Sequence, residues 1–380
     1  MNRREVKRAP VLRFKGFTND WEQRKLGDIS EIIRGASPRP ISDPKWFNSN
    51  SNIGWLRISD VTAQHGRIQH LSQHISILGQ AKTRVISTPH LLLSIAASVG
   101  YPVINYVKTG VHDGFLIFEN PKFNIDFGFY WLAFYKHEWQ KFGQPGSQVN
   151  LNSSIVKKTN IGLPDNVEQK AIVHLLKLID NRITLQQRKL ESFQFTYHEI
   201  IRRLFLKKAK WQQTKLSDLV TILDKNRKPV KKEDRLFGDT PYYGANGIQD
   251  YISGFTHKGE FILIAEDGAN SLTEYPIYFV KGQIWVNNHA HVLKVNKDVS
   301  PLFLALALKQ INYSKYTVGS SRNKLNLKDL ENIAIFIPDN NEQQKIGQFY
   351  SNYLNYLRIN KKRIQYMKQF KQFLLQNMFI

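Results

Sequence analysis

The chain has 380 residues and no cysteine, which excludes disulfide bonds and thiolate metal sites and suits a reducing compartment. Lys and Arg number 54 against 31 Asp and Glu, a formal net charge of +23, and this excess predicts a polyanionic partner, with nucleic acid as the leading candidate. No apolar run reaches bilayer length, so we expect a cytoplasmic protein rather than a membrane protein.

Two motifs each occur twice along the chain. A tryptophan motif reads WEQRKLGDI from Trp21 and WQQTKLSDL from Trp211. A proline motif reads LPDNVEQKAI from Leu163 and IPDNNEQQKI from Ile337, with six of ten positions identical. A Gly-Ser segment precedes each proline motif. This order predicts two half-repeats and five segments: an N-terminal segment at 1–20, a first domain at 21–163, a central helix at 164–208, a second domain at 209–337 and a C-terminal helix at 338–380.

The stretches between the motifs predict two similar α+β domains. Short runs such as RVISTPHLLLSIA, GFLIFE, EFILIAED and IWVNNHAHVLKV are rich in β-branched and aromatic residues and are bounded by turn formers. Each domain also carries one helical pattern before its Gly-Ser segment, FGFYWLAFYKHEWQKF from Phe127 and SPLFLALALKQI from Ser300. We therefore expect mixed β structure with a few helices in each domain.

A coiled-coil seam follows each proline motif. Apolar residues recur alternately four and three apart, as Leu176, Ile179, Ile183, Leu190, Phe193, Tyr197, Ile200 and Leu204 in the first copy and Ile346, Tyr350, Tyr353, Leu357, Ile364, Met367, Leu374 and Met378 in the second. Two unrelated helices would instead show broader apolar stripes without a match between the copies.

A polar residue interrupts each seam at its midpoint, Gln186 in the first and Asn360 in the second. In an antiparallel pair these two amides would meet in one layer and fix the register. We therefore predict a pseudo-twofold molecule whose spacer helices, about 55 Å long at about 1.5 Å per residue, hold the two domains apart. Such domains could address two DNA sites separated by roughly one helical turn or more.

The sequence shows no pattern typical of a catalytic or metal site. It lacks a P-loop, a Gly-x-Gly-x-x-Gly fingerprint and a His-Glu-x-x-His helix. His289 and His291 share a predicted strand and would face the same side, which favours core or groove-facing histidines over a metal pair. The FENPKF stretch from Phe118 lacks the second proline of an amino-methyltransferase loop. We predict no catalytic residue and no metal ligand.

Basic and amide-rich loops recur in both halves, and these side chains suit DNA. Arg pairs with guanine and Asn or Gln with adenine, while Lys, Ser and backbone amides bind phosphates. Any one of these residues taken alone is more simply explained as part of a solvated turn, but the match between the loops of the two halves favours DNA binding by the set. The predicted DNA-binding residues are Arg34, Arg39, Arg57, Ser147, Gln148, Asn150, Asn152, Lys225, Arg227, Lys228, Tyr243, Asn246, Asn287, Asn288, Ser320, Ser321, Arg322 and Asn323.

The duplicated order resembles the specificity subunit of type I restriction–modification enzymes. The resemblance rests on the Trp-x-x-x-x-Leu-x-Asp start, the YYGANGIQDY and WVNNHAHVL stretches, the Gly-Ser loop and the Pro-x-x-x-Glu-Gln helix, and it covers the chain from about Trp21 onward. It implies two target-recognition domains, each reading one half of an asymmetric bipartite site on double-stranded DNA. It also implies a non-catalytic chain that assembles with two methyltransferase (modification) subunits and with restriction subunits that translocate and cleave. S-adenosylmethionine, ATP and Mg would then belong to those partners, and this chain would bind no cofactor directly.

Two other functions remain open at this point. A standalone methyltransferase or nuclease would need a cofactor loop or an acid cluster, and methylation by the purified chain alone would reveal one. A coiled-coil scaffold that binds only protein would leave the charge of +23 unexplained, and absent or salt-insensitive DNA binding would favour it.

Overall fold

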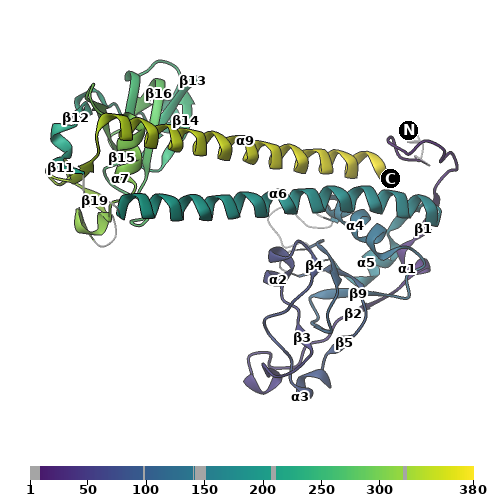
Figure 1. The fold of residues 1–380 in the computed structure, drawn as a ribbon. Coiled ribbons are helices and arrows are strands. Elements are labelled where there is room, and N and C mark those ends of the chain that lie inside the picture. Colours follow the sequence, from purple (N-terminus) through teal and green to yellow (C-terminus); the bar gives the residue numbers. More distant parts are fainter. Residues whose placement is uncertain (1–8, 97–98, 140, 142–150, 207–210, 320–322) are drawn as a thin grey trace. The chain divides into compact units, whose positions relative to one another are not determined.

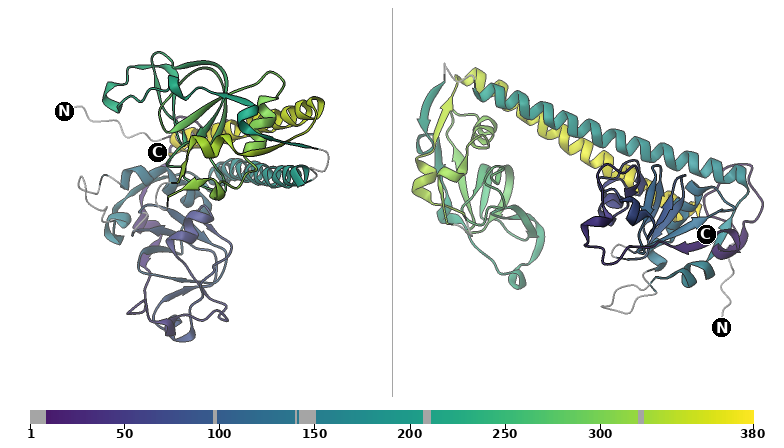
Figure 2. Two further views of the ribbon diagram at one scale, coloured as in Figure 1. Left: turned by 90° about the vertical axis from the view of Figure 1, so that its left-hand side faces the viewer. Right: turned by 90° about the horizontal axis from the view of Figure 1, so that it is seen from below.

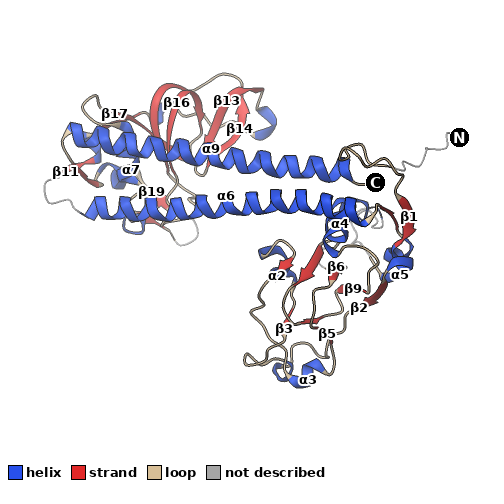
Figure 3. Cartoon of the chain, turned by 45° about the vertical axis from the view of Figure 1, so that its right-hand side comes forward, coloured by secondary structure: helices blue, strands red, loops and turns tan. Residues whose placement is uncertain are grey.

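A computed structural model describes residues 9–96, 99–139, 141, 151–206, 211–319 and 323–380. The chain divides into two compact units, one comprising the residues up to Gln186 together with Arg363–Ile380 and the other comprising Gln187–Lys362. Both long helices, α6 (Asn166–Leu206) and α9 (Asn340–Met378), cross this division, so each unit contains one end of each helix. Figure 1 shows the two long helices and Figure 3 separates helix from strand by colour.

The first unit contains the first α+β domain. Its strands are β1 (Glu22–Lys25), β2 (Glu31–Arg34), β3 (Gly54–Trp55), β4 (Arg67–Ile68), β5 (Arg84–Ile86), β6 (Leu91–Ser94), β7 (Pro102–Asn105), β8 (Thr109–Val111), β9 (Phe115–Glu119) and β10 (Asn160–Leu163). Its helices are α1 (Leu26–Ile29), α2 (Ile58–Ala63), α3 (Ile77–Gln80), α4 (Ile125–Trp139) and α5 (Ser153–Lys158), with a 3-10 turn at Pro44–Trp46. Within the described residues the sheets run β2-β9-β6-β7-β4, β3-β8-β5 and β1-β10.

The second unit contains the second α+β domain. Its strands are β11 (Gln212–Lys215), β12 (Val220–Ile222), β13 (Phe237–Gly244), β14 (Gly247–Ile252), β15 (His257–Ala265), β16 (Ile277–Val286), β17 (Ala290–Val295), β18 (Thr317–Val318), β19 (Lys324–Leu325) and β20 (Ala334–Ile337). Its helices are α7 (Pro301–Leu308) and α8 (Leu327–Glu331), with 3-10 turns at Leu216–Asp218, Asp224–Asn226, Lys232–Asp234 and Tyr313–Lys315. Within the described residues the sheets run β12-β17-β15-β16-β13-β14, β11-β20 and β18-β19.

The duplicated motifs meet in space within each unit. The strand of the first tryptophan motif pairs with the strand before the first proline motif, Glu22 opposite Leu163, and the second copies repeat the pairing with Gln212 opposite Ile337. The residue after each motif strand donates its backbone N–H to an equivalent carbonyl, from Leu26 to Thr159 and from Leu216 to Ile333. The motifs therefore close each domain at its base.

The proline motif also builds the start of each long helix. Asp165 accepts hydrogen bonds from the backbone N–H groups of Val167 and Glu168, and Asp339 accepts one from Glu342, so each aspartate satisfies donors that a helix start leaves unpaired. The glutamine of the motif is buried in both copies, 2% exposed at Gln169 and 4% at Gln343.

This glutamine joins each long helix to the helix of its own domain. Gln169 donates to the Pro164 carbonyl at 2.9 Å and accepts from the N–H of Asn124, just before α4. Gln343 donates to the Pro338 carbonyl at 3.1 Å and accepts from the N–H of Ser300, the N-cap of α7. Helices α4 and α7, both expected from the sequence, thus lie where each domain meets its long helices (Figure 1).

The ends of the long helices pack antiparallel within each unit. In the first unit Ile172 and Leu176, near the start of α6, share a core with Leu374 and Met378, near the end of α9, and Lys371 pairs with Asp180 at 2.6 Å. In the second unit the end of α6 packs against the start of α9, with the Tyr197 and Tyr353 rings stacked at 3.4 Å between centroids. Figure 2 gives two further views of these helices.

One part of the predicted seam is wrong at the end of α6. Ile200 is 46% exposed, whereas Ile201 is 2% exposed and Phe205 is buried beyond it. The buried positions after Tyr197 therefore advance by four residues at a time instead of alternating three and four. A straight helix has 3.6 residues per turn, so a strict 3.5-residue pattern drifts out of the contact face unless the helices supercoil.

The prediction of a single strand through both histidines is also wrong. Strand β16 ends at Val286 and β17 begins at Ala290, and Asn287 accepts a hydrogen bond from the His289 N–H at 2.8 Å in the turn between them. His289 consequently lies in the turn, where it contacts Asp267 at 2.6 Å, while His291 lies in β17. Asparagine side chains stabilise such turns by bonding to the backbone two residues on.

Candidate nucleic-acid interface

A basic loop between β12 and β13 is fastened to the sheet of the second domain. The Lys228 N–H donates to the Val286 carbonyl at 3.0 Å, and the Trp285 indole donates to the Lys228 carbonyl at 2.7 Å. The Val230 N–H donates to the Tyr242 hydroxyl at 3.1 Å. These contacts hold the backbone of the loop while the side chains of Lys225 and Lys228 stay exposed. The loop therefore presents cations from a fixed position.

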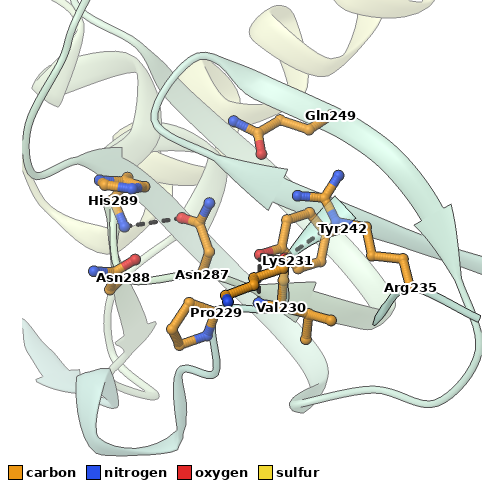
Figure 4. Close-up of a pocket in the computed structure, with 9 residues that line it drawn as sticks. All are labelled: Pro229, Val230, Lys231, Arg235, Tyr242, Gln249, Asn287, Asn288 and His289. Atoms are coloured by element: carbon orange, nitrogen blue, oxygen red, sulfur yellow. Dashed lines mark hydrogen bonds between the residues drawn. The ribbon is translucent and has the colours of Figure 1, made fainter. Parts of the chain in front are cut away.

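A pocket of about 490 Å³ lies between this loop and the β16–β17 turn. Figure 4 shows Asn287, Asn288 and His289 on one side and Tyr242 and Arg235 on the other. The guanidinium of Arg235 lies 4.2 Å from the centroid of the Tyr242 ring and pairs with Asp250. The pocket is lined by Pro229, Val230, Lys231, Arg235, Tyr242, Gln249, Asn287, Asn288 and His289. It therefore combines amides with cations, the groups that suit base edges and phosphates.

Two predicted residues line this pocket, two more lie on the basic loop beside it, and the side chain of a fifth, Arg227, is largely buried. Lys225 and Lys228 lie on the basic loop, and Asn287 and Asn288 lie in the facing turn. Asn287 is 4% exposed, and its side-chain oxygen already accepts the hydrogen bond from the His289 N–H that stabilises the turn. Arg227 is held in ion pairs with Asp224 and Glu266, and its side chain is 15% exposed.

Tyr243 and Asn246 lie at the neighbouring β13–β14 hairpin. The Asn246 amide donates to the Gly268 carbonyl and accepts from the Asn270 N–H, so it fastens the segment after β15. Burial, reinforced by the nearby hydroxyls of Tyr251 and Tyr278, raises the pKa of Tyr243, which therefore stays a neutral hydroxyl at ordinary pH. Lys231, Arg235, Gln249 and His289 were not predicted. Two of them lie in the basic stretch 224–235, Gln249 follows Asn246 in YYGANGIQDY, and His289 follows Asn288 in WVNNHAHVL, so a broader selection from the same stretches would have included all four.

In the first domain two predicted arginines gather around Asp113. Arg34 donates to the Asp113 backbone carbonyl at 2.6 Å, and Arg39, 72% exposed, pairs with the carboxylate at 2.6 Å. Burial acts to raise the pKa of Asp113, but the Ser37 hydrogen bond and both arginines outweigh it and the pKa lies below its usual range. Arg84, which was not predicted, donates to the Arg34 carbonyl at 2.7 Å. This corner is a fixed basic surface.

Two further predicted residues have structural partners. Arg57 is the N-cap of α2, pairs with Asp60 at 3.1 Å and donates to the Ser72 hydroxyl at 2.7 Å. Asn152 is the N-cap of α5 and accepts from the Ile155 N–H. Asn323 precedes β19 and is half-buried. The other predicted residues lie outside the described residues: Ser147, Gln148, Asn150, Ser320, Ser321 and Arg322.

Gln186 and Asn360 remain a predicted pair. They belong to different compact units, and the Asn360 amide donates to the Tyr356 carbonyl of its own helix at 2.9 Å.

No helix in the described part of the chain combines the length and the apolar character that a membrane span requires.

The family comparison agrees with the two closed domains and their long helices. A family model described as "Type I restriction modification DNA specificity domain" matches the chain twice, over residues 18–193 and 208–369. The chain belongs to this family. The family is one of DNA specificity rather than catalysis, and the expected resemblance and the expected fold of two α+β domains with two long helices are confirmed.

Relatives of this specificity chain have been named in bacteria and archaea. It is 44% identical over 131 residues to S.HindORF215P of Haemophilus influenzae, a match that spans 34% of each chain, so about a third of that relative's length. It is 23% identical over 340 residues, 82% of each chain, to the type I restriction enzyme EcoprrI specificity subunit of Escherichia coli. It is 21% identical over 401 aligned positions to the MjaIX specificity subunit of Methanocaldococcus jannaschii, covering 94% of this chain and 92% of the relative.

Solved structures share the fold at low identity. The S subunit of a type I restriction-modification system from M. genitalium matches with a TM-score of 0.66 and 16% identity, covering 98% of this chain and 99% of that one. A chain from a study of complex assembly and conformational transition of the type I R-M system matches with a TM-score of 0.56 and 16% identity, covering 93% and 96%.

Proposed function

We propose that this chain is the non-catalytic specificity subunit of a type I restriction–modification enzyme and that each of its domains reads one half of an asymmetric bipartite site on double-stranded DNA. The observation that carries the proposal is the duplication. Each of the two α+β domains is closed by a pair of strands, one from the tryptophan motif and one before the proline motif, and each is followed by a long helix. The domains differ between those strands, so the two half-sites need not share a sequence. The long helices act as the spacer between the half-sites.

In the second domain the reading surface is the pocket and the loops around it. The exposed Lys225 and Lys228 contact phosphates, which position the domain, and the amides of Asn288 and Gln249 read base edges. In the first domain Arg39, whose side chain is 72% exposed, supplies the corresponding cation.

The complete enzyme needs further subunits. Two methyltransferase (modification) subunits and restriction subunits that translocate and cleave would assemble on this chain in the cytoplasm. S-adenosylmethionine, ATP and Mg would be bound by those subunits rather than by this chain. The family is one of DNA specificity, which favours this assembly over a standalone methyltransferase or nuclease. Binding only to protein would leave the net charge of +23 without a counterpart.

Mapping the methylated bases in DNA from cells that carry the complete system tests the proposal. We expect modification at a two-part sequence, and exchange of residues 216–333 for those of a relative should change one part and leave the other intact. A purified chain that methylates DNA alone would contradict the non-catalytic assignment.

Salt dependence tests the loop assignment. Log Kd against log salt concentration should flatten by about 0.9 per lost phosphate contact when Lys225 or Lys228 is changed to Ala. Lys297→Ala, an exposed lysine in the turn between β17 and α7, is the matched control and should leave the slope unchanged. Equal slopes in all three variants would refute the loop assignment.

A further inference from the structure

Four ionisable side chains from three segments meet beside the pocket of the second domain. Asp224 and Arg227 come from the basic loop, Glu266 follows β15, and His291 comes from β17. The ligand atoms of Asp224, Glu266 and His291 lie within 4.8 Å of one another. A spacing of this kind suits a metal ion, but here Arg227 bridges the two carboxylates.

Every nitrogen of the Arg227 guanidinium has an acceptor within the domain. One terminal nitrogen lies 2.6 Å from Glu266 Oε2 and also donates to the Ala290 carbonyl at 3.0 Å. The other terminal nitrogen lies 3.3 Å from Asp224 Oδ2, and Nε donates to the Asp224 carbonyl at 3.1 Å. Because each guanidinium nitrogen faces an acceptor of the protein and the side chain is 15% exposed, Arg227 is poorly placed to contact DNA.

Asp224 and His291 extend the network to two more strands. His291, 2% exposed, lies 2.6 Å from Asp224 Oδ2 through Nδ1, and its Nε2 lies 3.0 Å from the Leu325 carbonyl of β19. The other Asp224 oxygen accepts from the Val292 N–H at 2.9 Å. Burial acts to raise the pKa of Asp224, but the His291 hydrogen bond and the Arg227 charge hold it below its usual range. Asp224 therefore stays a carboxylate.

The backbone completes the connection between the loops. The Leu325 N–H donates to the Glu266 carbonyl at 2.7 Å, and the Glu266 N–H donates to the His289 carbonyl at 2.9 Å. Arg227 also reaches the Asn288 carbonyl at 3.4 Å. The basic loop, the segment after β15, the β16–β17 turn and the residues after the Gly-Ser loop are thus joined through one network. Among these segments, the basic loop carries Lys225 and Lys228, the β16–β17 turn carries Asn287 and Asn288, and Asn323 directly precedes β19.

We infer that Arg227 is a positioning residue for specificity: through Asp224, Glu266 and His291 it holds the second domain's DNA-reading loops in one arrangement and itself touches neither base nor phosphate. This inference rests on the proposed function, because it concerns the half-site that the second domain reads. It replaces the sequence-based expectation that Arg227 contacts DNA. A side chain whose partners lie in the protein alters base selection through the loops and leaves the number of neutralised phosphates unchanged.

The test measures binding of the full chain, assembled with its modification subunits, to duplexes that carry the mapped site. The variants are Arg227→Gln, Arg227→Lys, Glu266→Gln and the Arg227→Gln/Glu266→Gln pair, with Lys228→Ala as the exposed neighbour. Fluorescence anisotropy gives Kd at several salt concentrations for the correct site and for duplexes altered at each position of either half-site.

For Arg227→Gln we expect discrimination across the whole second half-site to fall tenfold or more, with the salt slope and the first half-site unchanged. The loss of discrimination caused by Arg227→Gln should be smaller when Glu266 is also changed to Gln, because the Glu266 carboxylate is then no longer left without its cation. Lys228→Ala should instead lower the slope by about 0.9 and leave discrimination intact. If Arg227→Gln does not fold, Arg227→Lys, which keeps the charge but loses the bridging geometry, decides the question by the same measurements.

Three results would overturn the inference while sparing the proposed function. They are a salt slope reduced by about 0.9 in the Arg227 variants, a loss of discrimination at one base pair only, and wild-type discrimination in the variants. A wild-type complex that does not discriminate at the second half-site would refute the proposed function itself.

Discussion

Replacing Gln343 by leucine should destabilise the second unit by about 2–4 kcal/mol. The Gln343 amide is 4% exposed and makes two hydrogen bonds, accepting from Ser300 N–H at 3.0 Å and donating to the Pro338 carbonyl at 3.1 Å. Leucine has a similar volume but no polar atom, so both backbone groups would remain buried without a partner. Each such group costs about 1–3 kcal/mol, offset in part by the added apolar burial.

The surroundings leave little room for water to replace the lost amide. One turn along α9, a Cβ added at Gly347 would lie 2.8 Å from Ser300 Oγ, which shows how closely the long helix approaches the start of α7. We therefore expect the two unpaired backbone groups to lower the free energy of unfolding without relief from an entering water molecule. Urea unfolding should show the loss as a lower midpoint at an unchanged m-value, and the amide protons at the start of α7 should exchange faster with solvent.

Gln344 provides the matched control in the same helical turn. Its side chain is exposed and its one hydrogen bond, to Asn340, is 3.5 Å long. Gln344→Leu should therefore change the unfolding free energy by no more than about 0.5 kcal/mol. If the two leucine variants were equally stable, the glutamine of the proline motif would not be the link between long helix and domain.

Three other predictions concern the long helices and their ends. Arg13→Ala should destabilise the first unit by about 3–5 kcal/mol in urea unfolding, because Glu168 is 1% exposed and pairs with Arg13 at 2.6 Å. The control, Arg24→Ala, removes an exposed ion pair with Glu22 and should cost under about 1 kcal/mol. Similar losses of stability in the two variants would contradict this prediction. Burial, reinforced by Tyr353, raises the pKa of Tyr350 to about 12. The stability that the neutral Tyr350 hydroxyl contributes is therefore complete below about pH 10 and is lost as the pH rises toward 12 and the hydroxyl ionises. The unfolding free energy of Tyr350→Phe should fall less steeply over that range, and equal slopes would refute the assignment. Gln186→Leu with Asn360→Leu should stabilise the helix pair but loosen its register, as measured by disulfide crosslinking of introduced cysteines; an unchanged crosslinking pattern with lower stability would argue against an amide layer.

The long helices could be predicted because their signals are local and repeated. The aspartate after each proline accepts from helix N–H groups, and the apolar spacing continues for several turns. The pairing of Glu22 with Leu163 could not be read in the same way, because it joins residues at the two ends of a domain and neither strand alternates in polarity. The duplication placed these strands at corresponding positions, but their contact is a tertiary property.

The DNA-binding prediction was least secure where a polar side chain already has a partner within the protein. Arg227 looked like a free cation in a basic loop, yet Glu266, which holds it, lies 39 positions away. Asn152 looked like an amide for base reading and is a helix cap, a role that its position before Ser153–Lys158 could have indicated. Lys225 and Lys228 are exposed as expected, and their contact with DNA stays a prediction.

The strand pairs at the base of each domain also bear on how such chains acquire new targets. Because Gln212 lies opposite Ile337, the chain enters and leaves the second domain at adjoining points. The segment between those points can be lengthened, shortened or replaced in one genetic exchange, because its two ends need only join the neighbouring strands β11 and β20. Recombination within the duplicated motifs would then replace the second domain and leave the long helices unchanged.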